Sequence, residues 1–417
     1  MSAAGGPTVG APVGRRRPRW RTAASVAGGI LIVLTVAGTT VSISGEYGSW
    51  VPVALAGEAV FGLTPHDDGL LIASGSGVQL LRPNGAVSGW DVPGRVSGLL
   101  VDHDTVWAAT ESGLVCLSAG GAVTGETAFA GIDVAAVSAA VDGGGGLWAG
   151  TADGLYGTAP EGPRNGQWSR LWPAAGEPAQ PVPALLDTGE GVLFAHPDGI
   201  ARYDPTVKVV SLVHAGVTVV SLTALDDEHG GQIWAGLRGD PLLLASIDGG
   251  STWSPRSQGL GFTAVNRVIA DPAAPGRLLV AGSGLATATG NAGVQTSDDG
   301  GVTWTVEQGR LSNTHVFDLY AVTEPVRLSV TAITGGTLSV PVFVRSANVY
   351  AGTNGGGVYV FRPALTGLDW LAVLRPVLRF MDPVLAGLIL LLWLVPVYQR
   401  LAHARRAPAA LSTPAGR

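Results

Sequence analysis

One pattern occurs twice in this sequence, first as Ser246-Ile-Asp-Gly-Gly-Ser-Thr-Trp253 and again as Ser297-Asp-Asp-Gly-Gly-Val-Thr-Trp304. Both copies fit the pattern Ser-x-Asp-x-Gly-x-Thr-Trp, whose fixed positions are Ser246, Asp248, Gly250, Thr252 and Trp253 in the first, and Ser297, Asp299, Gly301, Thr303 and Trp304 in the second. The Asp carboxylate of such a stretch can accept hydrogen bonds from backbone N–H groups of its own turn. The Gly allows positive φ, and the Trp can fix the turn to its sheet. We therefore expect two turns that serve stability rather than chemistry.

A second repeat runs through most of the chain. Short apolar stretches end in a large residue followed by Ala, as in Leu147-Trp-Ala-Gly150 and Ile233-Trp-Ala-Gly236. The recurring alanines are Ala73, Ala108, Ala149, Ala195, Ala235, Ala281 and Ala351. All the steps between them except the last suit a four-stranded β-propeller blade of about 40–50 residues. The long last step predicts an inserted hairpin at 326–345.

The repeat predicts an all-β fold, a seven-bladed β-propeller of four-stranded antiparallel blades over residues 46–362, flanked by two transmembrane helices. In the sixth unit we expect strands at 265–270, 277–281, 293–297 and 302–306. The last blade lacks a fourth strand, and the stretch 48–53 can supply it by pairing antiparallel with 357–361. Such closure removes an exposed sheet edge. It would also place both connections to the chain ends on the side that carries the two Asp turns.

With its two full copies of Ser-x-Asp-x-Gly-x-Thr-Trp, the chain resembles the Asp-box (BNR-repeat) superfamily. That group includes sialidases, the sortilin luminal propeller and photosystem II assembly factors. The resemblance covers roughly residues 49–362, and only the fifth and sixth units carry full boxes. It implies a fold and not an activity, because function depends on sites grafted onto folds.

Composition narrows the function classes. Residues 45–362 hold 29 acidic and 14 basic side chains, a net charge of −15. This acidic body argues against a nucleic-acid partner, which needs a basic surface. Cys116 is the only cysteine, so an intramolecular disulfide is excluded. We expect no cofactor.

Two apolar segments lie outside the repeat. Residues 22–45 follow five arginines and are long enough for a transmembrane helix, and residues 383–399 are just long enough and precede three more arginines. The positive-inside rule then places 1–21 and 400–417 in the cytoplasm and the propeller outside the cell membrane, with 363–382 as a linker or interfacial segment. The lipid bilayer is thus one expected partner. A cleaved signal peptide is the alternative for the first segment, and a buried core helix for the second.

The side opposite the Asp turns is the expected binding face for another protein or a glycan. Its candidate residues, each of which can also be a plain turn residue, are Glu111, Asp153, His196, Asp198, Arg238, Asp240, Asn291 and Asn354. The acidic clusters at 66–68, 102–104 and 226–229 could offer oxygen ligands to a cation. Because polar turns are expected there for solubility, we assign no metal site.

Two function classes remain. The first is a non-catalytic binding, scaffold or assembly protein, which we favour. The second is a membrane-tethered glycoside hydrolase of sialidase type. The resemblance implies that a sialidase would carry an arginine cluster, a Tyr–Glu pair and a Phe-Arg-Ile-Pro stretch, and neither that pair nor that stretch stands out here. We assign no catalytic residues. A channel lined by clustered Arg, Glu and Tyr would favour the hydrolase, and one lined by small and apolar residues would favour the binding protein.

Overall fold

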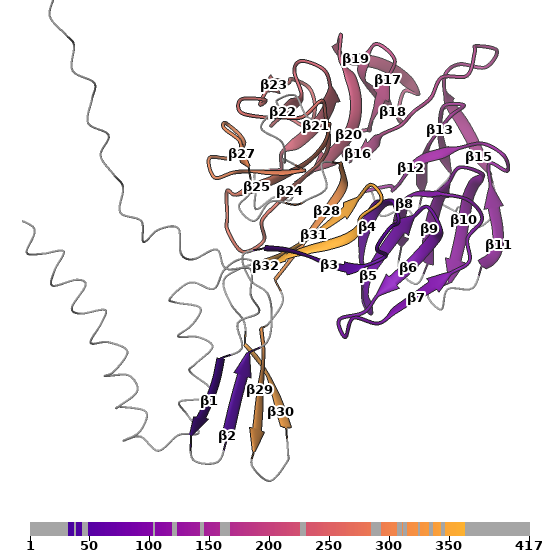
Figure 1. The fold of residues 1–417 in the computed structure, drawn as a ribbon. Coiled ribbons are helices and arrows are strands. Elements are labelled where there is room, and N and C mark those ends of the chain that lie inside the picture. Colours follow the sequence, from indigo (N-terminus) through magenta and orange to yellow (C-terminus); the bar gives the residue numbers. More distant parts are fainter. Residues whose placement is uncertain are drawn as a thin grey trace, which may run out of the picture.

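The computed structural model describes residues 32–36, 39–43 and 49–362, except for 103–104, 119–122, 142–145, 159–166, 226–230, 285–292, 307–310, 312–314, 324–325, 333–336 and 343–346. Every regular element within these residues is a β-strand (Figure 1). The all-β prediction is confirmed for this part of the chain. Among the same residues there is no helix long and apolar enough to cross a membrane.

The strands form four-stranded antiparallel units that follow one another along the chain, and the fifth and sixth units are joined into one eight-stranded sheet by the pairing of Arg238 with Ala264. The first three units are β4 (Val60–His66), β5 (Gly69–Ser74), β6 (Gly77–Leu81) and β7 (Val87–Trp90); β8 (Val96–Asp102), β9 (Thr105–Thr110), β10 (Gly113–Ser118) and β11 (Val123–Ala128); and β12 (Val134–Ala139), β13 (Leu147–Thr151), β14 (Leu155–Thr158) and β15 (Trp168–Trp172). The next three are β16 (Leu185–Asp187), β17 (Val192–His196), β18 (Gly199–Asp204) and β19 (Val209–Ala215); β20 (Thr218–Ala224), β21 (Ile233–Arg238), β22 (Leu243–Ser246) and β23 (Ser254–Pro255); and β24 (Ala264–Ala270), β25 (Leu278–Ser283), β26 (Val294–Ser297) and β27 (Thr305–Val306). The last unit combines β28 (Val316–Val322), β31 (Asn348–Thr353) and β32 (Gly357–Arg362) with β3 (Ser49–Ala54).

The first strands of the units form a closed ring. Each contacts the first strand of the next unit, from β4 through β8, β12, β16, β20 and β24 to β28, and β28 contacts β4 again. This cyclic order of antiparallel sheets is the architecture of a β-propeller. The predicted sixth unit is confirmed, since β24 to β27 lie within a few residues of the expected strands.

Small residues in the second strands let neighbouring units pack closely. All of the recurring alanines are buried there. The glycine that follows three of them, at 150, 236 and 352, lies against the next unit: a Cβ on Gly236 would lie 2.4 Å from the carbonyl oxygen of Val265 in β24. A Cβ on Gly150 would meet the carbonyl oxygen of Val182 at the same distance. The Ala-Gly pair therefore sets the spacing between units.

The ring closes as predicted. Strand β3, near the chain's start, pairs antiparallel with β32, and Trp50 lies opposite Phe361. The two rings are 5.4 Å apart between centroids. The last unit is thus completed by a strand from the other end of the chain, which leaves no open edge on β32.

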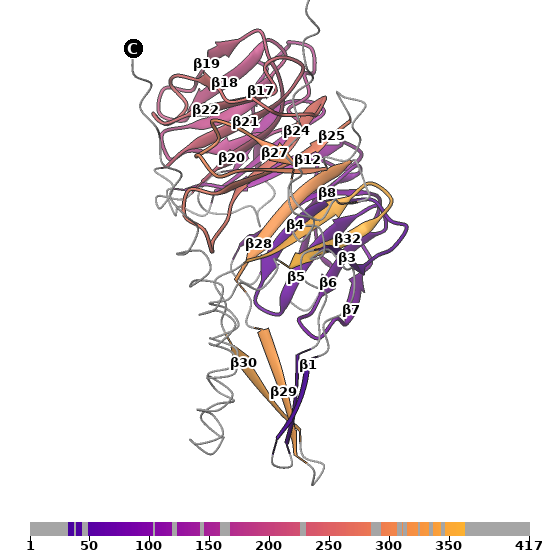
Figure 2. The same cartoon turned by 60° about the vertical axis from the view of Figure 1, so that its left-hand side comes forward.

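A further four-stranded sheet stands apart from the ring (Figure 1, Figure 2). Its order is β1 (Ile32–Val36), β2 (Thr39–Ile43), β29 (Val326–Ala332) and β30 (Thr337–Val342). The pair β29–β30 is the predicted inserted hairpin. Its antiparallel pairing with β2, which sets Ser42 opposite Ser329, was not predicted.

Strands β1 and β2 also replace part of a predicted helix. Within the predicted span 22–45 the structure has strands in these two stretches, which are rich in Ile, Val and Thr and pair with each other from Ile32 opposite Ile43 onward. β-Branched side chains restrict χ1 and favour strands over helices. The rest of 22–45, the linker 363–382, the second predicted span 383–399 and the tails 1–21 and 400–417 lie outside the described residues.

Antiparallel pairing gives the ring two distinct ends. Turns between first and second strands and between third and fourth strands share one end, which we call the box end because residues 246–253 and 297–304 lie there. Turns between second and third strands lie at the opposite, far end. Ser49 pairs with Arg362 at the box end, so both connections toward the chain termini leave from it. The β29–β30 hairpin joins a first strand to a second strand and leaves from the same end.

Candidate functional site

The first box turn is organised around one carboxylate. Asp248 Oδ1 accepts hydrogen bonds from Ser246 Oγ at 2.8 Å, Thr252 N at 2.8 Å and Ser251 N at 3.1 Å. Its Oδ2 accepts a fourth from Thr252 Oγ1 at 2.6 Å. Ser246 Oγ in turn accepts from the backbone N–H of Gly250 at 2.8 Å. The predicted acceptor role of Asp248 matches this geometry.

The second box turn repeats these contacts. Asp299 accepts from Ser297 Oγ at 2.7 Å, Thr303 N at 2.8 Å, Val302 N at 3.0 Å and Thr303 Oγ1 at 2.5 Å. Hydrogen bonds from the threonine side chains, followed by those from the backbone, hold the pKa of both Asp248 and Asp299 at about 2. The carboxylates are therefore ionised at neutral pH and already accept several donors each.

The two box tryptophans act differently. Trp253 Nε1 donates to the carbonyl of Gly250 in its own turn, at 3.1 Å. Trp304 is buried, and its Nε1 donates at 2.8 Å to the carbonyl of Arg256 in the preceding unit. Trp304 also packs edge-on against Trp234 of β21, with centroids 6.3 Å apart. The second box is thus joined directly to its neighbouring unit.

The predicted binding residues lie at the far end, in the turns between second and third strands or at the strand ends beside them. They are Glu111, Asp153, His196, Asp198, Arg238, Asp240 and Asn354, whereas Asn291 lies outside the described residues. The structure does not gather them into one cluster through the contacts they make. The backbone N–H of Glu111 binds the carbonyl of Arg95, and that of Asn354 binds the carbonyl of His315, each within its own unit. His196 receives a hydrogen bond from the N–H of Asp198 at 3.0 Å.

Asp153 belongs to a compact polar group of the third unit. Its carboxylate accepts a hydrogen bond from the hydroxyl of Tyr156 and lies 3.5 Å from Arg170 Nη2. Burial, and then the hydrogen bond to Asp153, raise the pKa of Tyr156 to about 12. The phenol stays protonated at neutral pH, so it serves as a hydrogen-bond donor rather than a nucleophile.

Two aromatic residues lie on β-bulges near the start of their first strands, at the far end of the ring. Six first strands shift register directly after a buried valine, as at Val60 of β4 and Val316 of β28. The extra residues Phe61 and Phe317 stack with centroids 5.2 Å apart, and the exposed Arg95 guanidinium lies 5.1 Å from the Phe61 centroid. Bulges commonly re-aim a side chain beside a functional site. We call Phe61, Arg95 and Phe317 the far-mouth patch. It was not predicted from the sequence, although β4 and β28 both begin with Val-Phe.

One ion pair crosses the ring interior between neighbouring units. Arg267 Nε of β24 lies 3.4 Å from Asp318 Oδ1 of β28. The two oxygens of Asp318 also accept backbone N–H bonds from Leu63 at 2.7 Å and from Leu319 at 2.9 Å. Burial raises the pKa of Asp318, and Arg267 and these N–H groups partly oppose that rise. Asp318 thereby ties β28 to β24 on one side and to β4 on the other.

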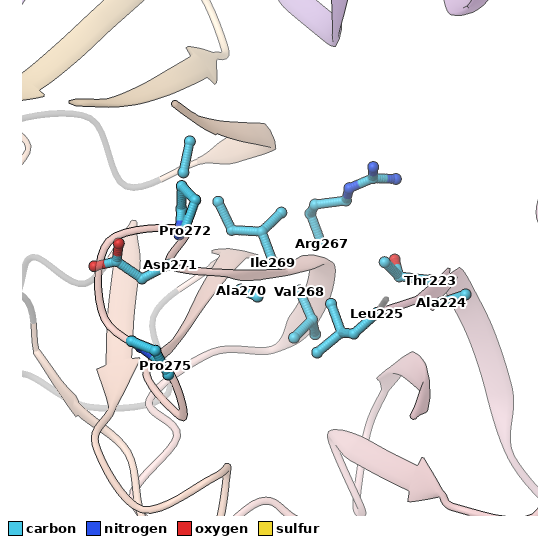
Figure 3. A pocket seen from close by; sticks show the side chains of 11 residues that line it. Thr223, Ala224, Leu225, Arg267, Val268, Ile269, Ala270, Asp271, Pro272 and Pro275 are labelled. Carbon is cyan, nitrogen blue, oxygen red and sulfur yellow. The ribbon is translucent and has the colours of Figure 1, made fainter. Parts of the chain in front are cut away.

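A cavity of about 420 Å³ opens at the box end, and the sequence analysis did not predict it. In Figure 3, Arg267 and Asp271 lie apart from each other along the lining of the cavity, and the aliphatic residues Val268, Ile269 and Ala270 of β24 lie between them. The ends of β20, β24 and β28 line it with Thr223, Ala224, Leu225, Arg267, Val268, Ile269, Ala270, Asp271, Pro272, Pro275 and Ala321. No group of three or more His, Cys, Asp or Glu side chains that could hold a metal ion occurs among the described residues.

No protein-family model matches this sequence, and no curated protein matches it. Solved structures do. The extracellular domain of BT4673 from B. thetaiotaomicron aligns with a TM-score of 0.57 and 15% identity over 77% of this chain and 40% of that one. The GH74 xyloglucanase from Xanthomonas campestris aligns with a TM-score of 0.53 and 13% identity over 75% of this chain and 53% of that one. This chain thus spans about half or less of either protein, and at these identities the likeness shows the β-propeller fold alone.

Proposed function

We propose that this chain is a seven-bladed, Asp-box-type propeller that is held at a membrane and binds a protein or glycan outside the cytoplasm without catalysing a reaction. The seven closed four-stranded units and the repeated box geometry support the blade number and type. The function rests on one observation above all, the far-mouth patch of Phe61, Arg95 and Phe317. Aromatic and arginine side chains carry much of the binding energy of protein interfaces.

The position of the patch agrees with this reading. It lies at the end opposite the chain connections, where an incoming partner meets neither the β1–β2–β29–β30 sheet nor the connections to the termini. The predicted turn residues Glu111, Asp153, His196, Asp198, Arg238, Asp240, Asn291 and Asn354 would form its rim. A stacked, half-buried aromatic pair is also pre-organised, which lowers the entropic cost of binding.

The first strands do not supply the carboxylate pair of a glycoside hydrolase. Their carboxylates are Asp102 of β8, Asp187 of β16 and Asp318 of β28, on strands that are not neighbours in the ring. Asp187 accepts hydrogen bonds from Trp148 Nε1 and the backbone of Gly189, and Asp318 pairs with Arg267. Arg267 is the only arginine in these strands. A glycosidase needs two carboxyl groups flanking one bond, so these residues favour the binding protein.

A site-specific cross-link tests the binding face. A photoreactive phenylalanine analogue replaces Phe317 in the full-length chain in its native host, and the matched control replaces Ile247, which is 77% exposed on the first box turn. We expect a discrete adduct from position 317 that disappears in the F61A/R95A double variant, and none from 247. Adducts from 247 alone would contradict the proposal. Release of sugar from a glycan by the purified chain would contradict its non-catalytic part.

The membrane proposal rests on the arginines that flank both ends of the chain. We propose the segment 383–399 as the anchor, with residues 400–417 in the cytoplasm and the propeller outside the cell membrane. Protease added to intact cells should then remove the propeller and leave a C-terminal tag protected. An N-terminal tag decides whether 22–45 crosses as well: protection supports a second span, and cleavage places β1 and β2 outside. A C-terminal tag that is cleaved from intact cells would refute the anchor.

A further inference from the structure

The box-end cavity contains a buried polar atom without a partner. Thr223 is 8% exposed, and its Oγ1 has no hydrogen-bond partner in the structure. Other buried threonines of the ring are satisfied: Thr110, Thr151 and Thr353 each donate to a glycine carbonyl at 2.7–3.0 Å. An unpaired buried hydroxyl is costly and uncommon in native proteins. Thr223 lines the cavity, so a molecule in that cavity can complete its hydrogen bonding.

Arg267 provides a charge at the same place. Its side chain is 41% exposed, and its Nε lies 3.4 Å from Asp318 Oδ1 in an ion pair without a hydrogen bond. No other ion pair or hydrogen bond involves Arg267 among the described residues, so its two terminal nitrogens remain available to the cavity. Asp318 holds the guanidinium in position because it is itself fixed by the N–H groups of Leu63 and Leu319. A planar guanidinium held in this way matches a carboxylate with two parallel hydrogen bonds.

The remaining acidic group of the cavity is occupied by its own turn. Asp271 is 5% exposed, accepts the N–H of Ala273 at 2.9 Å and lies 3.4 Å from Arg277 Nη1. The rest of the wall is mostly apolar, and includes Leu225, Ile269, Pro272 and Pro275. The volume is within the usual range for small-molecule sites, about 300–1,000 Å³. The cavity therefore combines the two terminal nitrogens of the Arg267 guanidinium and the unpaired hydroxyl of Thr223 with aliphatic walls.

We propose that this cavity binds a monocarboxylate with a compact apolar body. Arg267 pairs with the carboxylate, Thr223 donates a further hydrogen bond, and the aliphatic walls cover the apolar body (Figure 3). A doubly charged phosphate fits less well, because only one guanidinium faces it and the carboxylates of Asp318 and Asp271 are close by. The site is separate from the far-mouth patch, so the proposal does not depend on the function proposed above.

Binding to the full-length chain in detergent, followed by calorimetry or ligand-observed NMR, tests the proposal. The probes are sodium hexanoate, its neutral analogue hexanamide, inorganic phosphate, and the peptide acetyl-Leu-Ala with a free or an amidated C-terminus. We expect hexanoate to bind at least about tenfold more tightly than hexanamide and more tightly than phosphate. If the free-acid peptide binds better than hexanoate and its amide does not bind, the carboxylate comes from a peptide C-terminus. If hexanoate binds better, it comes from a small molecule.

The variants separate the site from the fold. T223V keeps the shape and removes only the unpaired hydroxyl, so it should weaken hexanoate binding about three- to tenfold without lowering the melting temperature. R267K keeps the positive charge but loses the planar guanidinium that can donate two parallel hydrogen bonds, so it should weaken hexanoate binding about tenfold or more. K208Q, which removes an exposed positive charge from the turn between β18 and β19, is the control and should bind as the unchanged chain does. No saturable hexanoate binding, equal affinity for hexanamide, or unchanged binding in both T223V and R267K would overturn the proposal.

Discussion

The two adjacent glycines of the second box turn allow backbone strain to be separated from packing. Gly300 has φ +68° and no atom within 4 Å of where a Cβ would lie. Gly301 has φ +85°, and its Cβ would lie 2.3 Å from Cη2 of Trp234. Trp234 is 1% exposed and packs against the buried Trp304, so its rigid ring has little room to move. Alanine at either position is destabilised by the positive φ, and only in Gly301→Ala does the new methyl group also overlap the ring of Trp234.

The expected magnitudes follow from these geometries. Placing a residue with a Cβ in a left-handed conformation costs about 1–2 kcal/mol, which is the whole effect expected for Gly300→Ala. Overpacking a well-packed core adds about 1–3 kcal/mol, so Gly301→Ala should lower the free energy of unfolding by about 2–5 kcal/mol. The difference between the two variants isolates the contact between the box turn and β21 of the preceding unit.

Urea unfolding of the full-length chain in detergent, followed by tryptophan fluorescence, measures both variants. Trp234 and Trp304 lie at the contact and are two of the twelve tryptophans that contribute to the signal. A Gly301→Ala variant as stable as Gly300→Ala, or more stable, would show that the box turn does not brace the neighbouring unit. The double variant Gly301→Ala with Trp234→Leu should recover part of the packing cost, because the shorter side chain vacates the space that the new methyl group needs.

Three further predictions concern the boxes, the spacing of units and ring closure. Hydrogen bonds lower the pKa of Asp248 and Asp299 from 3.8 to about 2, so the stability that these carboxylates contribute is full above the unfolded-state pKa and is lost as pH falls toward 2. The difference in melting temperature between the unchanged chain and D248N/D299N should therefore be widest above about pH 5 and should close near pH 2. A difference that does not depend on pH would contradict the role of the ionised carboxylates. Gly236→Ala should destabilise the chain in urea by about 1–3 kcal/mol, because its Cβ would overlap the carbonyl oxygen of Val265. Gly75→Ala is the control and should change stability little, because Gly75 is an exposed turn residue without positive φ and with no atom within 4 Å of its Cβ position. Equal values would argue against close packing of units at the Ala-Gly pair. Trp50→Ala should lower the free energy of unfolding by about 2 kcal/mol, roughly half the value for a fully buried tryptophan. Removal of residues 49–54 should expose the edge of β32 and cause aggregation that light scattering detects. A monodisperse deletion variant would refute closure of the ring by β3.

Features that repeat along the chain could be predicted from the sequence. The recurring Ala of each second strand, the inserted hairpin at 326–345 and the pairing of the Trp50 strand with 357–361 were all expected, and the structure contains them. The box turns could be predicted because their hydrogen bonds join residues no more than four positions apart. Local spacing of this kind is visible in a linear sequence.

Contacts between distant units depended on the closed ring. Phe61 and Phe317 stack only because the first and last units meet, and Arg267 reaches Asp318 because neighbouring first strands converge. The pairing of β2 with β29 replaced part of a predicted helix for the same reason, since a partner strand from the far end of the chain was available. The box-end cavity needs the strand ends of three units. None of these pairs has a periodic signature, because each depends on the curvature that brings residues from separate blades to the same place.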